Sequence, residues 1–384
     1  MTLRLTLATI ALCGLVSGGP APVLAQGTAG RPGLDGLLSR LSSLDYDTRT
    51  GAARLIRRAP APEAVAALTT AVRSGSDQFV RYRALVLLTG FNDRSTPALM
   101  RSLLADRNDR VREVAYRWFE LHPEPALASP LFAALETEQA EFVRPALIRA
   151  LGALSSEPAV QRALTAEASR GLDFFRSAVI EVLGLRKATW AIAPVLDAAK
   201  TDGPLQDDAL LALGRMGDPR ALEVIAAVPD RPVEPAIAAQ AALCLLGDDC
   251  PARIAWLSDT MTSRVATREA VRSGAAALGA LALTSDQALA ALAALLGHDA
   301  VRADAAVGLG GVALRAPQRV LAFIEAATPT ERVPLVAAIA EAFERFEEDF
   351  AEEQFYAATR AAYWEAPEGA PTRTLMATLI EELD

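Results

Sequence analysis

The sequence predicts an all-α solenoid of about ten to eleven repeats, each made of two helices. Glycines recur along it with a period of about 31 residues, and most of them follow an apolar residue and an arginine by about eight residues. The glycines are Gly90, Gly152, Gly184, Gly214, Gly247, Gly279 and Gly310, and the apolar–arginine pairs are Val80-Arg81, Val111-Arg112, Val143-Arg144, Phe175-Arg176 and Val301-Arg302. A fixed period of this length with two helices per period is typical of an α-solenoid.

The repeating unit is clearest in residues 141–164. Its small and apolar residues follow a 3.6-residue period and therefore share one face of a helix. We expect that helix to end near Gly152. The next helix should begin at Pro158, because a proline is tolerated in the first turn, where its missing N–H costs no hydrogen bond. The shared face consists of Ala146, Leu147, Ala150 and Leu151.

The predicted repeats follow one another without a break in composition, so residues 34–384 are expected to form one continuous domain. Several helix starts are marked by prolines, namely Pro62, Pro97, Pro158, Pro219, Pro251 and Pro317. The predicted repeats occupy 34–59, 61–91, 95–122, 125–155, 157–186, 189–216, 218–248, 250–283, 285–314 and 316–346, with a final pair over 350–384.

The turn-and-helix pattern resembles a known repeat family. Residues 217–222 read Gly-Asp-Pro-Arg-Ala-Leu, and the second helices follow a pattern in which Asp precedes Val-Arg and, further on, Leu-Gly. This is similar to HEAT repeats of the short type, first described in phycobilisome lyases and common in bacterial proteins. The resemblance covers residues 34–384 and implies a right-handed solenoid. It implies no single function, because such repeats serve lyases, glycosylases, hydroxylases and scaffolds.

Residues 1–25 are predicted to be a secretory signal peptide. A single arginine precedes an apolar run from Leu5 to Val16, and small residues surround a cleavage site after Ala25. The run is well short of the ~20 residues that a membrane span requires. We therefore expect residues 26–33 to be a flexible leader of a periplasmic or secreted protein. No later segment is expected to span a membrane.

Charge is distributed unevenly along the chain, whose formal net charge is −9. Residues 26–120 hold fifteen arginines and ten acidic residues, a net charge of +5, whereas residues 341–384 hold twelve acidic residues and three arginines, a net charge of −9. We interpret the acidic segment as a solvated C-terminal cap at the open end of the solenoid. The same polarity could steer a partner along the repeats. A net negative, exported chain is not expected to bind nucleic acid.

The chain lacks the residues that common catalytic and metal sites need. It has two histidines, His122 and His298, and no His-Glu dipeptide of the kind that HEAT-repeat iron hydroxylases use. It has no G-x-S-x-G elbow, no phosphate-binding glycine loop and no H-E-x-x-H motif. We therefore expect no catalytic activity, no bound metal and no cofactor.

The recurring arginines are expected to hold the turns together. Arg81 would pair with Asp77, and Arg112 with Asp106 or Asp109, each acid lying in the turn that precedes its arginine. If exposed, such a pair contributes about 0–1 kcal/mol.

Two cysteines remain after the predicted cleavage, Cys244 and Cys250, on either side of Gly247. In an oxidising compartment they could form a disulfide that closes this turn. Two separate buried thiols are the alternative, and the spacing does not decide between them. Cys13 follows Leu12 inside the apolar run, which disfavours a lipoprotein signal.

One cluster has the composition of a binding hot spot, in which arginine, tyrosine and tryptophan are enriched. The alternative explanation is that its larger side chains pack the core. Helical spacing places Ala115, Trp118 and Phe119 toward the core and Tyr116 and Arg117 toward solvent or the inner groove. We expect a scaffold that binds a protein or peptide along its concave helical face. The alternative is a lyase-like protein that handles a small molecule or cofactor in a groove between repeats. The cluster consists of Arg110, Arg112, Tyr116, Arg117 and Trp118.

Overall fold

A computed structural model of the chain describes residues 33–230, 233–346 and 349–383. Within these ranges the regular elements are 22 α-helices and three short 3₁₀ helices, with no strand. The predicted all-α solenoid of two-helix repeats is confirmed, and the helices form eleven consecutive pairs. The predicted signal peptide and nearly all of the leader lie outside the described residues.

The helices of the eleven pairs have the following bounds. The first helices are α1 (Leu34–Arg40), α3 (Ala61–Ser74), α5 (Thr96–Leu103), α7 (Ala128–Thr137), α9 (Pro158–Glu167), α11 (Ile192–Ala199), α13 (Leu222–Ala226), α15 (Cys250–Thr262), α17 (Asp286–Leu295), α19 (Pro317–Ala326) and α21 (Asp349–Glu365). The second helices are α2 (Tyr46–Arg57), α4 (Gln78–Thr89), α6 (Asp109–Leu121), α8 (Arg144–Ala153), α10 (Asp173–Leu185), α12 (Gln206–Met216), α14 (Val233–Leu245), α16 (Arg268–Ala282), α18 (Arg302–Arg315), α20 (Pro329–Phe346) and α22 (Pro371–Leu383). The 3₁₀ helices η1 (Pro125–Leu127), η2 (Thr189–Ala191) and η3 (Pro219–Ala221) precede α7, α11 and α13.

Prolines begin helices where the sequence predicted. Each of the six marker prolines occupies the first or second position of its helix, in α3, α5, α9, η3, α15 and α19. The first turn of a helix has no intrahelical partner for its N–H groups, so proline removes nothing there. These prolines therefore set where the outer helix of a repeat begins.

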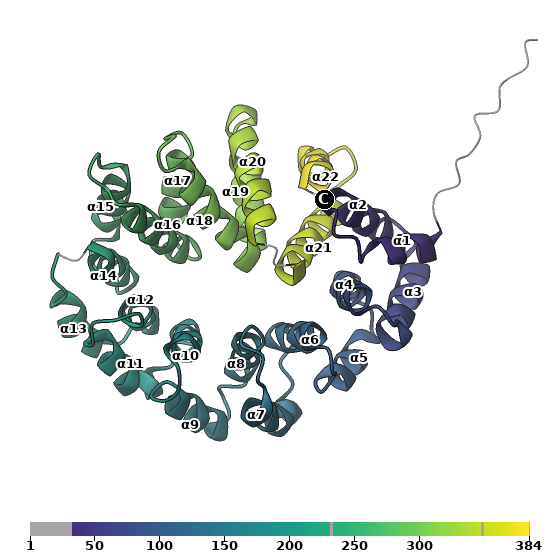
Figure 1. Cartoon of the computed structure of the whole chain (residues 1–384). Coiled ribbons are helices and arrows are strands. Elements are labelled where there is room, and N and C mark those ends of the chain that lie inside the picture. The colour runs from purple at the N-terminus through teal and green to yellow at the C-terminus, as the bar shows by residue number, and fades with distance from the viewer. Residues whose placement is uncertain (1–32, 231–232, 347–348, 384) are drawn as a thin grey trace, which may run out of the picture.

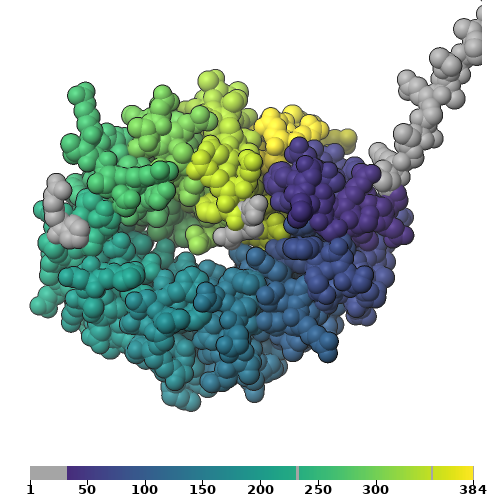
Figure 2. All heavy atoms as spheres, in the orientation of Figure 1, coloured from purple at the N-terminus to yellow at the C-terminus, as the bar shows by residue number. Residues whose placement is uncertain are grey.

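The helix pairs follow an arc that closes on itself (Figure 1). From α4 to α18 the even-numbered helices form the inner layer, each packed on the next, and the odd-numbered helices lie outside them. At the other end of the chain α21 packs on α4, so the first and last repeats meet. Figure 2 shows that side chains leave only a small opening near the centre. The expected open end with a solvated acidic cap is therefore wrong for α21, which is docked on the N-terminal repeats.

The periodic glycines bring the inner helices into close contact. A Cβ atom at Gly184 would lie 2.7 Å from Cα of Ala212, and one at Gly214 would lie 2.6 Å from Cα of Ala242. As predicted, Gly90 is the residue that follows α4, and Gly152 and Gly184 each lie one residue before the end of α8 and α10. The prediction that the glycines end helices is wrong for Gly279 and Gly310, which lie further inside α16 and α18. Gly247 does follow the end of α14, with a positive φ of 88°. Small residues recur because neighbouring backbones approach too closely for a larger side chain.

The arginine ladder exists, but it connects each repeat to the following one. The predicted pairing with the preceding turn is wrong, because Asp77 caps α4 by accepting hydrogen bonds from the N–H groups of Phe79 and Val80. Arg81, Arg144 and Arg176 also donate to a backbone carbonyl at or near the end of the preceding outer helix, as Arg81 does to Val72 at 2.8 Å. The inter-repeat pairs are Arg81–Asp106 at 2.6 Å, Arg112–Glu138 at 2.7 Å and Arg144–Glu167 at 3.8 Å.

The hydrophobic core follows the ring instead of gathering at a centre. Buried leucine, valine, isoleucine and alanine side chains run without a break from α1 to α14 and on from α14 to α22. Each repeat thus covers the apolar faces of its neighbours, as in other solenoids. Within the described ranges no helix is both long and apolar enough to cross a membrane.

Candidate functional site

The structure separates the five residues of the predicted binding cluster. Tyr116 and Trp118 are buried, at 1% and 3% exposure, and the Tyr116 hydroxyl donates to the carbonyl oxygen of Leu104 at 3.1 Å. The expectation that Tyr116 faces solvent or the inner groove is therefore wrong. An inner helix is covered by its own outer helix and by two inner neighbours, so fewer of its faces remain exposed than on a surface helix.

The three arginines of the cluster have different environments. Arg112 belongs to the inter-repeat ladder through Glu138. Arg117 lies 3.8 Å from Glu113 and its guanidinium is 5.3 Å from the ring centre of Phe350 in α21. The Arg110 side chain is 53% exposed, pairs with Glu113 at 3.4 Å and lies over the Phe142 ring. A partner-binding role for this cluster stays a prediction, and the structure leaves Arg110 as the member most accessible to a partner.

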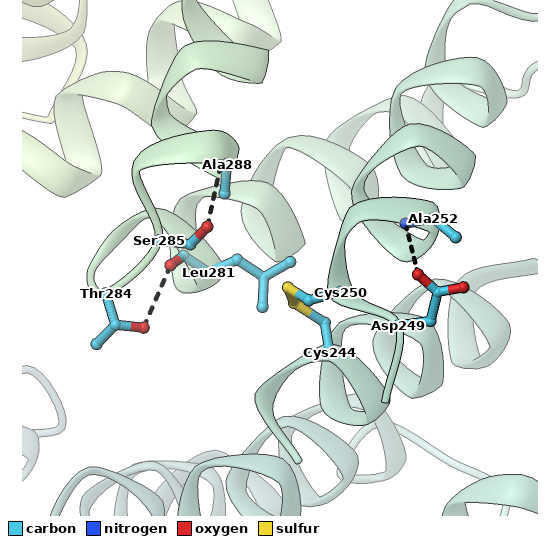
Figure 3. The surroundings of a disulfide bond; sticks show 8 residues. All are labelled: Cys244, Asp249, Cys250, Ala252, Leu281, Thr284, Ser285 and Ala288. Carbon is cyan, nitrogen blue, oxygen red and sulfur yellow. Dashed lines mark hydrogen bonds between the residues drawn. A yellow bond between two sulfur atoms is a disulfide. The ribbon is translucent and has the colours of Figure 1, made fainter. Parts of the chain in front are cut away.

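Cys244 and Cys250 form a disulfide between the end of α14 and the start of α15 (Figure 3). The turn between them contains Gly247 and Asp249, both with positive φ, and the Asp249 carboxylate caps α15 by accepting a hydrogen bond from the Ala252 N–H. The bond and the cap together fix the angle at which α15 leaves α14. Of the two readings that the sequence left open, the structure contains the disulfide.

The histidines lie at turns. The ring of His122 stacks on Trp118 with 3.8 Å between the ring centres, directly after α6. The His298 carbonyl accepts hydrogen bonds from the N–H groups of Val301 and Arg302 in the turn before α18. Across the residues that the structure describes, no group of three His, Cys, Asp or Glu side chains is placed to hold a metal ion.

A cavity of about 400 Å³ lies on the inner face of the ring. It is bordered by α10 and α12 and, beyond α14 along the chain, by α16 and α18, which Figure 1 shows on the other side of the central space. Its polar lining residues are Ser177, Glu181, Asp208, Arg215, Arg272, Asp304 and Arg315, and Phe346 at the end of α20 also reaches it. We refer to this feature as the inner cavity.

Two acidic groups of the inner cavity have partners. Glu181 of α10 lies 3.6 Å from Arg315 of α18, an ion pair between helices far apart in the sequence, and 3.5 Å from Arg149 of α8. Asp208 accepts a short hydrogen bond from the Ser177 hydroxyl. Burial raises the pKa of Asp208, and the hydrogen bond from Ser177 opposes that effect.

Two arginines of the inner cavity lack such partners. Within the described part of the chain, the guanidinium groups of Arg215 and Arg272 have neither a hydrogen bond nor an ion pair. Arg215 is partly buried in α12, and burial lowers its pKa although the charge of Glu181 opposes this. A partly desolvated cation without a partner is unfavourable, so a ligand that brings an anionic group would be stabilised here.

One wall of the inner cavity is made of small residues. α16 and α18 contribute Ala275, Ala276, Gly279, Gly308 and Gly311. A Cβ atom at Gly279 would lie 3.3 Å from the carbonyl oxygen of Gly308, so the two helices touch through their backbones. The Cβ positions of Gly279 and Gly308 are thus taken up by the contact between α16 and α18, whereas a Cβ atom at Gly311 would have only the Arg315 guanidinium within 4 Å.

The sequence analysis did not identify these residues. They come from four helices, and no local motif joins Glu181 to Arg215 or Arg215 to Arg272. The available signal was weak: Glu181 and Arg215 are charged residues inside the otherwise apolar second helices, beside the periodic glycines. Such charges could be assigned to an inner site only once the arrangement of the repeats was known.

Comparison with known proteins gives a family match and several solved structures with similar folds. A family model of HEAT repeats matches residues 34–120. The complex of CpcE and CpcF of phycocyanin lyase from Nostoc sp. PCC7120 is 22% identical with a TM-score of 0.42, over 65% of this chain and 96% of that chain. A search of curated protein sequences gave no match.

Two further solved structures are also similar over most of this chain. Kap121p bound to Pho4p is 15% identical with a TM-score of 0.41, over 91% of this chain and 45% of that chain. Importin beta in an ammonium sulfate condition is 14% identical with a TM-score of 0.39, over 91% of this chain and 55% of that chain. This chain thus spans about half the length of these two proteins.

Proposed function

Because this chain is a HEAT-repeat protein, we propose that it is a scaffold that binds a polypeptide segment of another protein on the inner face of its ring. The observation that carries the proposal is the half-buried guanidinium of Arg215 in the inner cavity, which has neither a hydrogen bond nor an ion pair among the described residues, while the exposed Arg272 lines the same space. Arginine binds carboxylates through a planar fork of N–H donors. The bound segment is therefore an acidic one, with a carboxylate directed at Arg215.

The remaining features of the inner cavity suit a polypeptide. The room beside Gly311, where a Cβ atom would have only the Arg315 guanidinium within 4 Å, lets a main chain lie against α18. Asp208 and Asp304 line the same space and can accept hydrogen bonds from main-chain N–H groups. The Ser177 hydroxyl and the Asp208 carboxylate are joined by a hydrogen bond in the same cavity, and the role we propose for this arrangement is binding.

We also propose that the protein acts outside the cytoplasm. Residues 1–25 have the features of a signal peptide, and a disulfide joins Cys244 to Cys250. Disulfides persist in oxidising compartments such as the periplasm. The partner would then be a periplasmic or secreted protein.

Fluorescence anisotropy with labelled peptides tests the proposed function. The probes are an octapeptide of alternating glycine and glutamate and its counterpart with glutamine in place of glutamate. We expect the acidic peptide to bind and the neutral one to bind at least tenfold more weakly. Arg215→Gln should weaken binding of the acidic peptide about tenfold or more, because one buried charged contact to a ligand usually contributes ~2 kcal/mol or more.

Arg264→Gln is the matched control. Arg264 is exposed in the turn before α16, so this substitution removes the same charge outside the inner cavity. Equal binding of both peptides, or equal losses in the two arginine variants, would contradict the proposal.

A second function is favoured by the size of the inner cavity. Its volume of about 400 Å³ is within the range of ~300–1,000 Å³ that small-molecule sites occupy. In that case the chain would hold a small anionic molecule, in keeping with the lyase-like alternative. Glutarate separates the two functions: a small-molecule site would bind it as tightly as the octapeptide, whereas a polypeptide site would bind it far more weakly.

A further inference from the structure

The ring is closed at one interface that differs from the others, which we call the seam. It lies between α21 and the N-terminal helices α2 and α4. Glu353 of α21 is fully buried there, with its two carboxylate oxygens 2.7 Å from Arg57 and 2.9 Å from Arg360. The Arg360 guanidinium also donates to the carbonyl oxygen of Gly90 at 3.3 Å, and Gln354 donates to the Thr89 hydroxyl at 3.0 Å.

Gly90 makes room for the buried carboxylate. A Cβ atom on this residue would lie 1.9 Å from Oε1 of Glu353 and 2.7 Å from the Arg360 guanidinium. Gly90 ends α4 with a φ of −75°, an ordinary value that any residue adopts. The glycine is therefore required by the space that Glu353 and Arg360 occupy and not by the backbone conformation.

Glu353 at the seam is more deeply buried than the polar contacts between other neighbouring inner helices, namely Arg149–Glu181 and Ser177–Asp208. α10 packs on α12, and α12 on α14, through glycine and alanine. At the seam a charged side chain and its partners are buried instead, and a cavity of about 470 Å³ lies between α2 and α4 on one side and α20–α22 on the other. Burying charges involves a large desolvation cost, which is recovered in part when the interface opens to water. Opening the seam would therefore return these charges to water.

The charge polarity of the sequence acts across this interface. The N-terminal residues 26–120 carry +5 and the C-terminal residues 341–384 carry −9, and the ring brings the two segments together. Their attraction favours closure, while the desolvation cost of the buried charges limits how strongly the closed state is held. An opposite-charge interface with a buried ion pair is suited to reversible closure.

From these observations we propose that α21 is a latch, held by Glu353, that closes the ring and controls access of polypeptides to the inner face. Its role in binding rests on the function proposed above. Opening of the seam does not depend on that function and can be measured without any ligand.

Thiol labelling at the inner cavity tests the latch. Ala276 of α16 lines the inner cavity and is exposed, so Ala276→Cys introduces a reactive group there. The background carries Cys13→Ser, and Cys244 and Cys250 are joined in the disulfide. The reagents are a small maleimide and a maleimide attached to a 5-kDa polyethylene glycol chain. Both labelling rates are measured under non-reducing conditions.

We expect Glu353→Gln to accelerate labelling by the large reagent at least threefold and to leave the small reagent unchanged. Glu365→Gln is the matched control, because Glu365 is exposed on the same helix. Gly90→Ala is a second variant that displaces the Glu353 carboxylate from the opposite side of the seam, and it should have the same effect as Glu353→Gln. Circular dichroism confirms that each variant retains its helices.

The latch would be refuted if the large reagent labelled the native ring as fast as both seam variants, or if Glu365→Gln had the same effect as Glu353→Gln. If the arginine variants lose peptide binding while maleimide labelling at position 276 is unchanged, that result bears on the proposed function alone. A variant that opens the seam without altering peptide binding would show a latch that does not control the binding site, and would contradict the regulatory role.

Discussion

Replacing Gly214 by alanine should destabilise the protein, although alanine favours a helix more than glycine does. The new Cβ atom would lie 2.6 Å from Cα and 2.9 Å from the carbonyl oxygen of Ala242. These are backbone atoms that cannot rotate away, so α12 and α14 must move apart. Overpacking of this kind costs ~1–3 kcal/mol, and we expect the upper end here. The better helix propensity of alanine recovers ~1 kcal/mol, which leaves a net loss of about 2 kcal/mol.

Gly51→Ala is the matched control. Gly51 lies inside α2, and a Cβ atom there would meet nothing within 4 Å. This variant should gain up to ~1 kcal/mol, so the two substitutions should shift stability in opposite directions. Urea unfolding followed by circular dichroism at 222 nm measures both. A Gly214→Ala protein as stable as the native chain would refute the conclusion that the inner helices touch through their glycines.

Three further predictions concern the ladder, the core and the disulfide. Glu138→Gln should destabilise the chain by about 2 kcal/mol at pH 7, because charged hydrogen bonds contribute ~1.5–3 kcal/mol. The corresponding loss for Glu124→Gln, whose pair with Arg101 is more exposed, should be ~1 kcal/mol or less in urea unfolding. Burial alone would raise the pKa of Glu138, but hydrogen bonds from Arg112 and the Ala140 N–H lower it overall. The ionised Glu138 carboxylate therefore stabilises the fold at pH values above ~4.3, which is the pKa of glutamate in the unfolded chain. This stabilisation is lost as the pH falls through the lower pKa that Glu138 has in the folded chain. Glu138→Gln should accordingly lose less stability than the native chain between pH 5 and pH 3. Tyr116→Phe should cost ~1 kcal/mol by removing the hydrogen bond to Leu104; a thermal melt identical to that of the native chain would contradict the buried position of the hydroxyl. Replacing both Cys244 and Cys250 by serine should lower the free energy of unfolding by about 2 kcal/mol in the chain-entropy model. When the unsubstituted protein is denatured and titrated with a thiol reagent, neither of these cysteines should react until a reductant is added.

The repeat architecture could be predicted because each repeat carries its own local signals. Prolines marked where outer helices begin, and the 31-residue period gave the helix pairs. The role of the glycines could not be predicted in the same way. A glycine near the end of an apolar helical run has the same sequence signature whether it ends the helix, as Gly247 does after α14, or contacts the next helix, as Gly214 does.

Features that depend on the stacking of repeats were beyond the sequence. Arg81 pairs with Asp106 of the following repeat because of the angle between successive pairs, which no single repeat specifies. Closure of the ring depends on small rotations added over eleven pairs. The inner cavity requires residues from four helices to converge. Only the unequal charge of the two ends can be read from the sequence. The contacts of Glu353 with Arg57 and Arg360 show where charges of the two ends meet at the seam.

Closure of the ring underlies both the inner binding face and the latch, and photo-crosslinking at position 354 tests it most directly. Gln354 of α21 lies against Thr89 of α4 in the closed ring. A photoreactive benzoylphenylalanine in place of Gln354, irradiated in dilute monomeric protein, should form an intramolecular crosslink that mass spectrometry assigns to the peptide containing Thr89. An open solenoid would instead give no crosslink to residues 78–90, or would give that crosslink only between two molecules at high concentration, and either result would contradict the closed ring.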